Sequence, residues 1–501
     1  MERLPNEVFC TVFLFTIFHN PRQGSGAGYN GLADFEITEG QTWPGVFQFS
    51  KGPWAISSVC RRWRTIATKF PQLWNRFRLT ASDLDPNTDD GGTTALTTWL
   101  SFSGTLTLSF FIQPDGICNN PHYSKLFGLL ADHADRWEKI ELYNSTPAFW
   151  SMLHAGDVRS RLGSLTTITV HSGETNVADD AFSGDPTFYQ VFLDAPQLRT
   201  LVNRNHLPCR GLELPWGQLT EYEGSHRTVV DEHLRLLRLT PNLEKCRLEI
   251  AYVASPVSTL PDGQAAAETA VPYNILLPNL QTLQIRTTWF SDSLKHFPVS
   301  IRRLRVPALK TLIILTEHLS RVPPPFSAYG EVLRASSSEL RSLKLINRPA
   351  AGIEDLRAGD ILELLRATPA LRDLCFTIGA TKKSRVLQDT IISRLDISEG
   401  GSRNGDGALV PVLETLELRF PSPAAIPMLN LATLAKAIRS RWTPLGPQSS
   451  IRSVRFVVEL GDVPVDKSIL SSAIRGPIME VLKGEEVDII IEIGNASVAG
   501  W

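Results

Sequence analysis

Cysteine and histidine, the side chains best suited to chemistry, are scattered along the chain without the spacing of a metal or catalytic site. The six cysteines stand far apart, at positions 10, 60, 118, 209, 246 and 375. None of the ten histidines forms an H-x-x-x-H pair, and no cysteine–histidine cluster has zinc spacing. The sequence also lacks a G-x-S-x-G motif and a Walker loop. We therefore expect a protein that is not an enzyme and that binds no metal or cofactor.

Two short motifs could bind a phosphate, and each has a simpler interpretation. The glycines of Gly24–Gly28 follow no strand pattern and precede no helix signal, which favours a flexible loop over a dinucleotide site. Arg61, Arg62 and Arg64 could form a phosphate-binding or nuclear-localisation patch. Arginines spread over one helix are more often a solvated face, and this is our interpretation.

Composition bounds the class of protein. The chain has 501 residues, of which 43% are hydrophobic and 20% charged, as is typical of a soluble globular protein. A formal net charge of -2 provides no basic field, so we expect no nucleic-acid partner. The apolar run Val8–Phe18 lacks a basic flank and is shorter than the about 20 residues of a membrane span. With cysteines this sparse, we expect an intracellular chain, cytoplasmic or nuclear, without a membrane partner.

The stretch Pro53–Leu79 carries a strong helical pattern. Its apolar residues recur every three or four positions, on one face of a helix: Ile56, Val59, Cys60, Trp63, Ile66, Ala67 and Phe70. Pro53 suits a first turn and Pro71 disfavours helix at Phe70, so one helix is expected between them. That helix needs a partner surface, for which the nearby candidate is the apolar run from Leu4 to Phe18.

Together these two segments resemble an F-box domain, in the divergent form common in large fungal families. The matching residues are Leu4, Pro5, Glu7, Val8, Ile17, Phe18, Val59 to Arg64, Ile66, Ala67, Pro71, Leu73 and Trp74. The departure is a glycine-rich insert at about residues 19–52, which we expect to be an irregular loop between the first two helices. The F-box domain is accordingly predicted to span residues 1–80.

Short L-x-x-L-x-L segments recur through the rest of the chain. The clearest copies begin at Leu280, Leu309, Leu340, Leu371 and Leu413. Looser copies begin at Trp137, Leu165, Leu243, Ile301 and Ile451, and the copy at Leu198 has Asn203 in its last apolar place. The steps 309 to 340 and 340 to 371 are both 31 residues, which indicates a true repeat. The pattern resembles the irregular leucine-rich arrays found behind many F-boxes.

The predicted fold class is therefore α/β, a small α-helical F-box followed over residues 95–501 by a leucine-rich-repeat solenoid. Both leucines of each L-x-L core point inward, and stacking the strands in parallel on the concave face buries them under convex-face helices. Helices are expected at 231–239, at 360–365 with Asp360 as cap, and at 431–442. Loops are expected at 82–95, 255–272 and 399–411, and a last strand at 487–493.

The F-box resemblance implies that the chain docks on the Skp-type adaptor of a cullin ubiquitin ligase. The residues implied for that contact are Leu4, Pro5, Val8, Ile17, Phe18, Val59, Cys60 and Trp63. Val59 and Trp63 could equally face the interior of the F-box. The repeats would then hold a protein substrate for ubiquitin-dependent degradation.

The substrate would bind to the outward residues of the concave strands. By strand alternation these include Lys245, Arg247, Glu249, Gln284, Arg286, Lys344, Glu417 and Arg419, with Ile313 and Cys375 as apolar members of the same row. A row of mixed charge suits a protein partner, although each of these residues could also be an ordinary solvated strand residue. A second hypothesis therefore stays open, an interaction scaffold whose F-box-like helices only cap the solenoid.

Overall fold

A computed structural model describes most of the chain. The described residues are 4–18, 43–80, 91–113, 121–143, 157–171, 190–204, 213–226, 230–251, 274–288, 301–317, 326–337, 339–348, 358–378, 382–396, 409–442, 451–459, 471–472, 474–476, 478, 480 and 488–494. They fall into two compact units, one reaching Tyr222 and the other beginning at Glu223.

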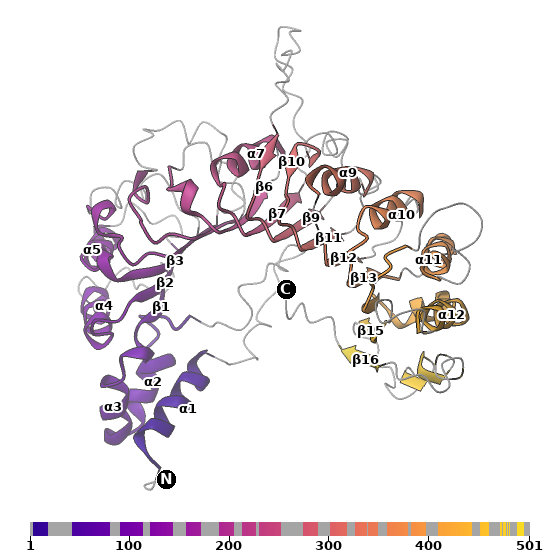
Figure 1. The fold of residues 1–501 in the computed structure, drawn as a ribbon. Helices are drawn as coiled ribbons and strands as arrows, with labels where there is room; N and C mark the ends of the chain where they lie inside the picture. The colour runs from indigo at the N-terminus through magenta and orange to yellow at the C-terminus, as the bar shows by residue number, and fades with distance from the viewer. Residues whose placement is uncertain are drawn as a thin grey trace, which may run out of the picture. The chain divides into compact units, whose positions relative to one another are not determined.

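The first unit opens with helices α1 (Asn6–Phe18), α2 (Gly52–Val59) and α3 (Arg61–Thr68) (Figure 1). The single helix predicted between Pro53 and Phe70 is wrong, because Cys60 is extended, with φ -159° and ψ 169°. Its sulfur accepts a hydrogen bond of 3.4 Å from the amide of Trp63, which an unbroken helix would give to Val59. Cys60 thus ends α2 and caps α3. Of the predicted insert, residues 19–42 lie outside the described residues.

The sheet of the first unit follows these helices. Strands β1 (Arg76–Thr80), β2 (Leu108–Gln113), β3 (Trp137–Tyr143), β4 (Thr167–His171) and β5 (Thr200–Arg204) pair in parallel in chain order. The division between the units falls within β6 (Glu221–His226). Helices α4 (Gly91–Phe102) and α5 (Pro121–Ala131) lie on one side of the sheet (Figure 1). Because α4 begins at Gly91, the loop predicted at 82–95 is shorter than expected.

Three tryptophans join the N-terminal helices to this sheet. Trp74 and Trp99 are fully buried, and the ring of Trp54 lies 4.9 Å from that of Trp74 and 5.7 Å from that of Trp99. The Trp74 indole donates to the carbonyl of Ala67 at 2.8 Å, and the Trp99 indole donates to that of Trp74 at 2.6 Å. The helices and the first strand therefore share one core, and the sheet begins inside the segment predicted as the F-box.

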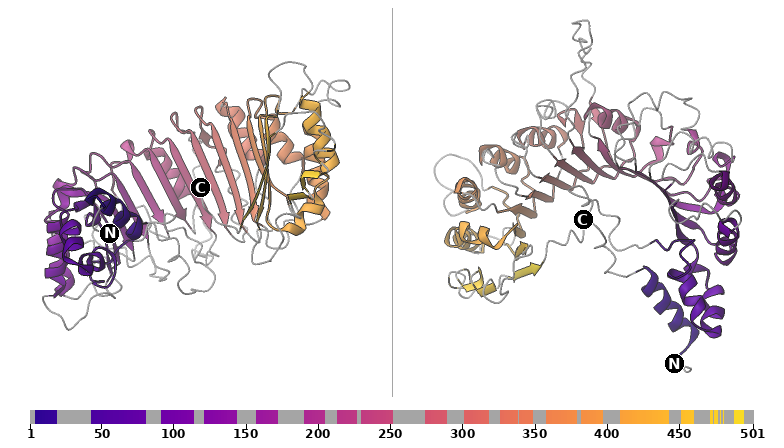
Figure 2. Two further views of the ribbon diagram at one scale, coloured as in Figure 1. Left: turned by 90° about the horizontal axis from the view of Figure 1, so that it is seen from below. Right: turned by 180° about the vertical axis from the view of Figure 1, so that it is seen from behind.

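The second unit repeats one strand–helix plan. Its strands β7 (Lys245–Ala251), β9 (Thr282–Thr288), β11 (Thr311–Glu317), β12 (Ser342–Arg348), β13 (Asp373–Thr377), β14 (Thr415–Phe420), β15 (Ser453–Glu459) and β16 (Asp488–Gly494) are parallel and follow chain order. Helices α7 (Val230–Leu239), α9 (Phe326–Ser336), α10 (Ala358–Arg366), α11 (Lys382–Leu395) and α12 (Leu431–Trp442) connect them. Figures 1 and 2 show α9 to α12 lying along the same face of the sheet.

Parallel strands in chain order, each with its leucines buried, confirm the predicted α/β solenoid. In the copy at Leu309, for example, Leu309, Leu312 and Ile314 are each 1% exposed. The strands predicted from the other clear copies form β9, β12, β13 and β14, and the last strand is β16. Helices α7 and α12 match their predictions.

Two repeat-level predictions need correction. The copy at Ile301 forms only β10 (Leu304–Arg305), which pairs with β8 (Ile275–Leu276) in a separate two-stranded sheet. Asp360 is not a helix cap, because α10 already begins at Ala358 and Asp360 lies in its first turn. An acidic side chain in that position still interacts favourably with the amino end of the helix. The predicted loops at 255–272 and at 399–408 lie outside the described residues.

Candidate protein-interaction site

Helix α1 packs one face on α3. Phe9 and Phe13 are buried, and their rings lie 6.0 Å and 5.0 Å from the ring of Trp63. The guanidinium of Arg62 lies 5.0 Å from the centre of the Phe9 ring and donates to the carbonyl of Leu4 at 2.7 Å. These contacts hold α1 against α3 through tilted aromatic ring pairs, a cation–π interaction and a hydrogen bond.

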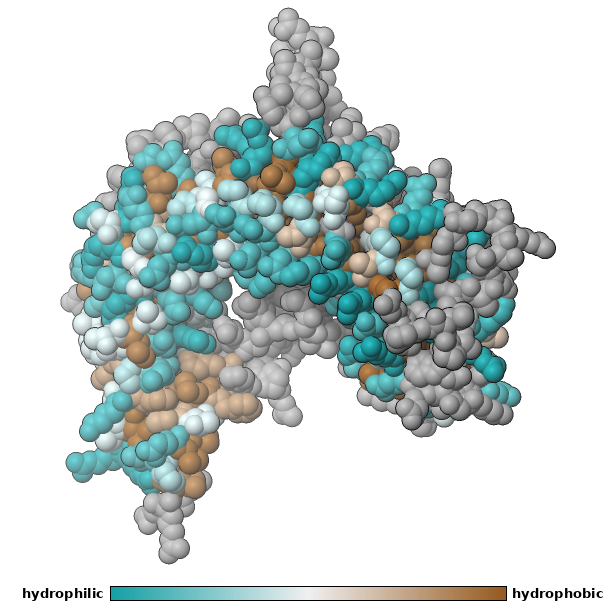
Figure 3. Space-filling model, in the orientation of Figure 1, coloured by the Kyte–Doolittle hydropathy of each residue, from teal (hydrophilic) through white to brown (hydrophobic). Residues whose placement is uncertain are grey.

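The opposite face of α1 presents bulky apolar side chains to solvent. Val8, Val12 and Phe15 of α1 are 41%, 51% and 63% exposed, and Leu4, just before the helix, is 46% exposed. We call these four residues the apolar outer face. Figure 3 shows hydrophobic residues gathered over the N-terminal helices, at the lower left. Val59, at the end of α2, is another exposed apolar residue, at 60%. Contiguous exposed apolar surface of this kind marks interaction sites.

The eight residues predicted to contact the adaptor differ in their exposure to solvent. Leu4, Pro5, Val8, Val59 and Cys60 are exposed and Trp63 is half-buried. Ile17 and Phe18 are each only 8% exposed, so their apolar surface is already used inside the chain.

Val12 and Phe15 were not among the predicted contact residues. Both follow Val8 at helical spacing, at +4 and +7, which could have identified them. The signal was obscured because nearly every residue from Val8 to Phe18 is apolar, so both faces of the helix qualified. Arg61, Arg62 and Arg64 are exposed, as predicted for a solvated face. Arg64 Nε also donates to the carbonyl of Ser57 at 3.0 Å, and Arg62 donates to the carbonyl of Leu4.

The eight predicted substrate residues lie on one face of the sheet of the second unit. Strand register places Arg247 beside Gln284 and Glu249 beside Arg286. It also places Lys344 beside Cys375, which is followed by Glu417. Lys245 is exposed, and Glu249, Gln284 and Glu417 are largely buried between their neighbours. Their shared face is thus established, whereas their contact with a substrate stays a prediction.

Ion pairs link the charged residues of this face. Arg247 lies 3.5 Å from Glu223, and Arg286 lies 3.9 Å from Glu249. Arg419 Nε lies 2.6 Å from Glu417 Oε1. The guanidinium of Arg455 lies 3.8 Å from Glu417 Oε2 and 2.5 Å from Glu492 Oε1, so it bridges the two carboxylates. Burial, followed by the charge of Glu417, raises the pKa of the Cys375 thiol to about 12 and keeps it protonated.

The sheet of the first unit carries a different group of side chains, which the sequence analysis did not select. The ring of Tyr143 lies 6.1 Å from that of Phe111 and 5.5 Å from that of His171, and His171 is beside Arg204 in the next strand. Burial, aided by the charge of Arg204, lowers the pKa of His171 to about 4. Burial also raises the pKa of Glu141, against the opposing effects of Arg204 and Lys139.

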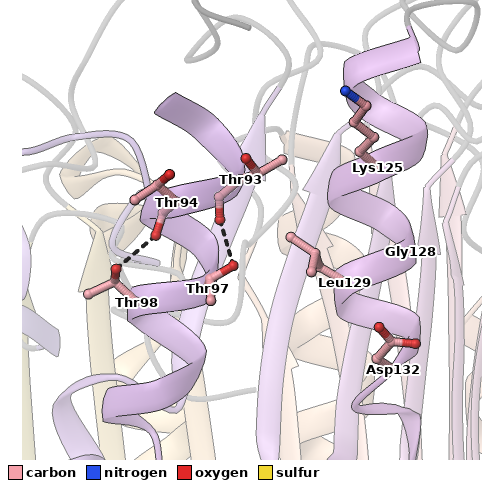
Figure 4. Close-up of a pocket in the computed structure, with 8 residues that line it drawn as sticks. All are labelled: Thr93, Thr94, Thr97, Thr98, Lys125, Gly128, Leu129 and Asp132. Atoms are coloured by element: carbon pink, nitrogen blue, oxygen red, sulfur yellow. Dashed lines mark hydrogen bonds between the residues drawn. The ribbon is translucent and has the colours of Figure 1, made fainter. Parts of the chain in front are cut away.

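A shallow groove of about 570 Å³ lies between α4 and α5 in the first unit (Figure 4). Thr93, Thr94, Thr97 and Thr98 line one side of it, and Lys125 and Asp132 belong to the other. The hydroxyls of Thr97 and Thr98 donate at 2.8 Å to the carbonyls of Thr93 and Thr94 in their own helix. These donors are therefore occupied within α4, and they do not converge on a ligand position.

Neither a metal site nor a membrane-spanning helix is found in the part of the chain that the structure describes. Within it, no group of three or more histidine, cysteine, aspartate or glutamate side chains could hold a metal ion. No helix in the same residues has the length and apolar character needed to cross a bilayer.

Comparisons with known proteins find no match among family models or among curated proteins. Among solved structures, a protein from Bacteroides fragilis aligns at 12% identity and a TM-score of 0.30, over 72% of this chain and 76% of that one. TLR13 in its complex with ssRNA13 aligns at 11% identity and a TM-score of 0.31, over 79% of this chain and 43% of that one. Similarity at this level supports no argument, so the description of the fold rests on the strands and helices of this chain.

Proposed function

We propose that the chain is the substrate-recognition subunit of a Skp–cullin–F-box ubiquitin ligase. The observation that carries the proposal is the apolar outer face of α1, on the same segments that resemble an F-box. In protein interfaces a handful of buried anchors near the centre each cost about 2 kcal/mol or more when truncated. Val8, Val12 and Phe15 on one helix face, with Leu4 just before the helix, are suited to that role, because they are exposed here and would be desolvated by a partner.

In this proposal the chain makes and breaks no covalent bond. The N-terminal helices bind the Skp-type adaptor, and the strand face of the second unit binds a protein substrate. Tethering both partners raises the effective concentration of the substrate's lysines near a ligase that other subunits complete. The protein would act in the cytoplasm or the nucleus, where the adaptor and the cullin are available.

A second candidate function is an interaction scaffold without a ligase role. The cluster of Trp54, Trp74 and Trp99 favours it, because these rings tie the helices to the first strand as a solenoid cap requires. A cap alone, however, needs only the inner face of α1. It provides no reason for Leu4, Val8 and Val12 to be bulky and apolar.

Co-purification with the Skp-type adaptor separates the two functions. The full chain and the adaptor would be co-expressed, and the affinity of the pair measured for the wild type and for Val12→Asp. Because Val12 is 51% exposed, a charge there should leave the fold intact yet weaken adaptor binding by about tenfold or more. Leu276→Asp is the matched control, since Leu276 is 58% exposed in β8 of the other unit, and it should bind like the wild type.

The ligase proposal fails if the wild-type chain does not bind the adaptor. It also fails if Val12→Asp and the double variant Leu4→Asp, Pro5→Ala both bind like the wild type. Either result would leave the scaffold as the supported function.

A further inference from the structure

In the part of the chain that the structure describes, β16 has a partner strand on only one edge. It pairs in parallel with β15, and it is the last strand of the sheet (Figure 1). We call its other edge the open edge. The edge of β1 differs, because the amide of Val46 donates to the carbonyl of Arg78 at 3.2 Å and the amide of Arg78 donates to that of Pro44 at 3.0 Å. The first strand is thus covered, and the last one is not.

The side chains of β16 show the effect of the open edge. Phe456 and Val458 of β15 point into the core and are buried. Their register partners Ile491 and Ile493 point the same way, yet they are only half-buried. Ile490, on the outward side of β16, is 37% exposed. A further strand along the open edge would remove part of this apolar surface from water.

The sequence of β16 does not protect this edge against pairing. Edge strands of natural proteins usually avoid other chains through lysine, proline, a bulge or a short length. β16 has seven residues, Asp488–Gly494, with three consecutive isoleucines and neither lysine nor proline. Its register with β15 runs without a bulge. The strand is therefore suited to accept another strand.

The backbone of β16 determines which residues a new strand would meet. The amide of Asp488 donates to the carbonyl of Arg452, next to β15, at 3.2 Å. Because backbone groups alternate in direction along a strand, every second residue from Asp488 onward bonds toward β15. The N–H and C=O groups of Ile489, Ile491 and Ile493 therefore point to the open edge. The isoleucines whose side chains face the core thus also present its donors and acceptors.

We propose that β16 pairs in antiparallel fashion with β16 of a second copy of the chain, with Ile491 opposite Ile491. In this register Ile489 of each copy lies opposite Ile493 of the other, so all three pairs with edge-facing backbone groups join isoleucine to isoleucine. A two-fold contact of this kind uses the same surface on both copies and closes as a dimer. The open edge therefore fits a second copy because its isoleucines are symmetric about Ile491.

The charges of β16 select the same register. With Ile491 at the centre, Asp488 lies opposite Gly494 of the second copy and Ile490 lies opposite Glu492, so no like charges meet. Glu492 keeps its ion pair with Arg455 of its own chain, at 2.5 Å. Moving the centre to Ile490 would place Asp488 opposite Glu492, and like charges directly opposite each other are destabilising.

The test measures self-association of the full chain by analytical ultracentrifugation over a concentration series. Ile490→Glu places a carboxylate opposite Glu492 of the second copy, twice in each dimer, and should raise the dissociation constant of the dimer by about tenfold or more. Ile490→Lys is the matched control at the same exposed position. It creates opposite charges there, so its dissociation constant should stay within about threefold of the wild type or fall.

Disulfide cross-linking tests the register independently. Opposed residues of a hydrogen-bonded antiparallel pair have Cα atoms about 5.5 Å apart, within reach of a disulfide, so Ile491→Cys should give a covalent dimer on mild oxidation. Val457→Cys, in β15, lies three strand spacings, roughly 14 Å, from its copy and should not. Both variants keep the native cysteines, so background cross-linking is common to them.

Three results would overturn the proposal. The wild type could remain a monomer up to about 100 μM, a concentration that would populate even a weak interface. The Glu and Lys substitutions at Ile490 could change the dissociation constant alike, which would place the contact elsewhere. Val457→Cys could cross-link as fully as Ile491→Cys. The dimer requires no adaptor, so its loss and the loss of the ligase function are measured separately.

Discussion

Arg441, at the end of α12, is only 1% exposed. Its guanidinium donates to the carbonyls of Leu395 at 2.7 Å, Val410 at 2.8 Å and Leu409 at 2.5 Å. Burial lowers the pKa of Arg441 to about 10, while the charge of Asp396 opposes that effect. The residue therefore stays charged near neutral pH and ties α11 and the segment before β14 to α12.

Arg441→Met should lower the free energy of local opening around β14 by about 2–4 kcal/mol, because three buried carbonyls lose their donor. Native-state hydrogen exchange of the β14 amides measures that energy. Arg439→Met is the matched control on the exposed side of the same helical turn, and it should change the energy by less than about 0.5 kcal/mol. Equal effects from the two variants would show that the guanidinium of Arg441 does not hold α11 and the segment before β14 against α12.

His171 should make the first unit less stable in acid. Its pKa is about 4 in the folded chain and 6.5 when unperturbed, so between these values the unfolded chain binds more protons. Stability contributed by neutral His171 is complete above pH 6.5 and is lost progressively as the pH falls to about 4, by a total of about 3 kcal/mol. Glu141, whose pKa is raised, acts in the opposite direction.

The contribution of His171 is obtained by difference. His171→Gln should flatten the decline in stability between pH 6.5 and 4 that the wild type shows in thermal unfolding, whereas the contribution of Glu141 is common to both proteins. Parallel pH profiles for the two proteins would contradict the assignment. Neither His171 nor Arg441 could be selected from sequence, because their surroundings come from strands and segments far apart in the chain.

At the scale of elements, the two faces of one strand should differ in their tolerance of substitution. Leu312 and Leu315 lie on opposite faces of β11, and Leu312 is 1% exposed whereas Leu315 is half-buried. Leu312→Ala should destabilise the second unit by about 2–5 kcal/mol through the cavity that it leaves. Leu315→Ala should cost less than about 1.5 kcal/mol, measured by hydrogen exchange of β11 and β12. Similar costs at both positions would contradict the assigned faces.

The repeat strands were predictable because L-x-x-L-x-L combines strand alternation with burial of three residues, and tertiary contacts agree with that local pattern. The copy at Ile301 failed for a reason that its spacing shows. It begins only 8 residues before the copy at Leu309, whereas the regular steps here are 31 residues, so both copies cannot form successive turns. The break at Cys60 was not predictable, because the apolar pattern on either side has the same helical period.

At the scale of the whole molecule, the proposal assigns one binding role to each compact unit. The sequence indicated the F-box-like helices and the repeats but not the division at Tyr222 and Glu223. That division falls within a strand, and no change in composition marks it. The exposure of Val12 and Phe15 also required the packing of α1 on Trp63, since only that contact distinguishes the two apolar faces of the helix.

Hydrogen–deuterium exchange of the full chain with and without the Skp-type adaptor tests the central claim most directly. We expect the adaptor to slow exchange in residues 6–18 of α1 and around the α2–α3 junction, while β9 to β14 exchange as in the free chain. Slowed exchange confined to the strands of the second unit, or no change anywhere, would contradict it.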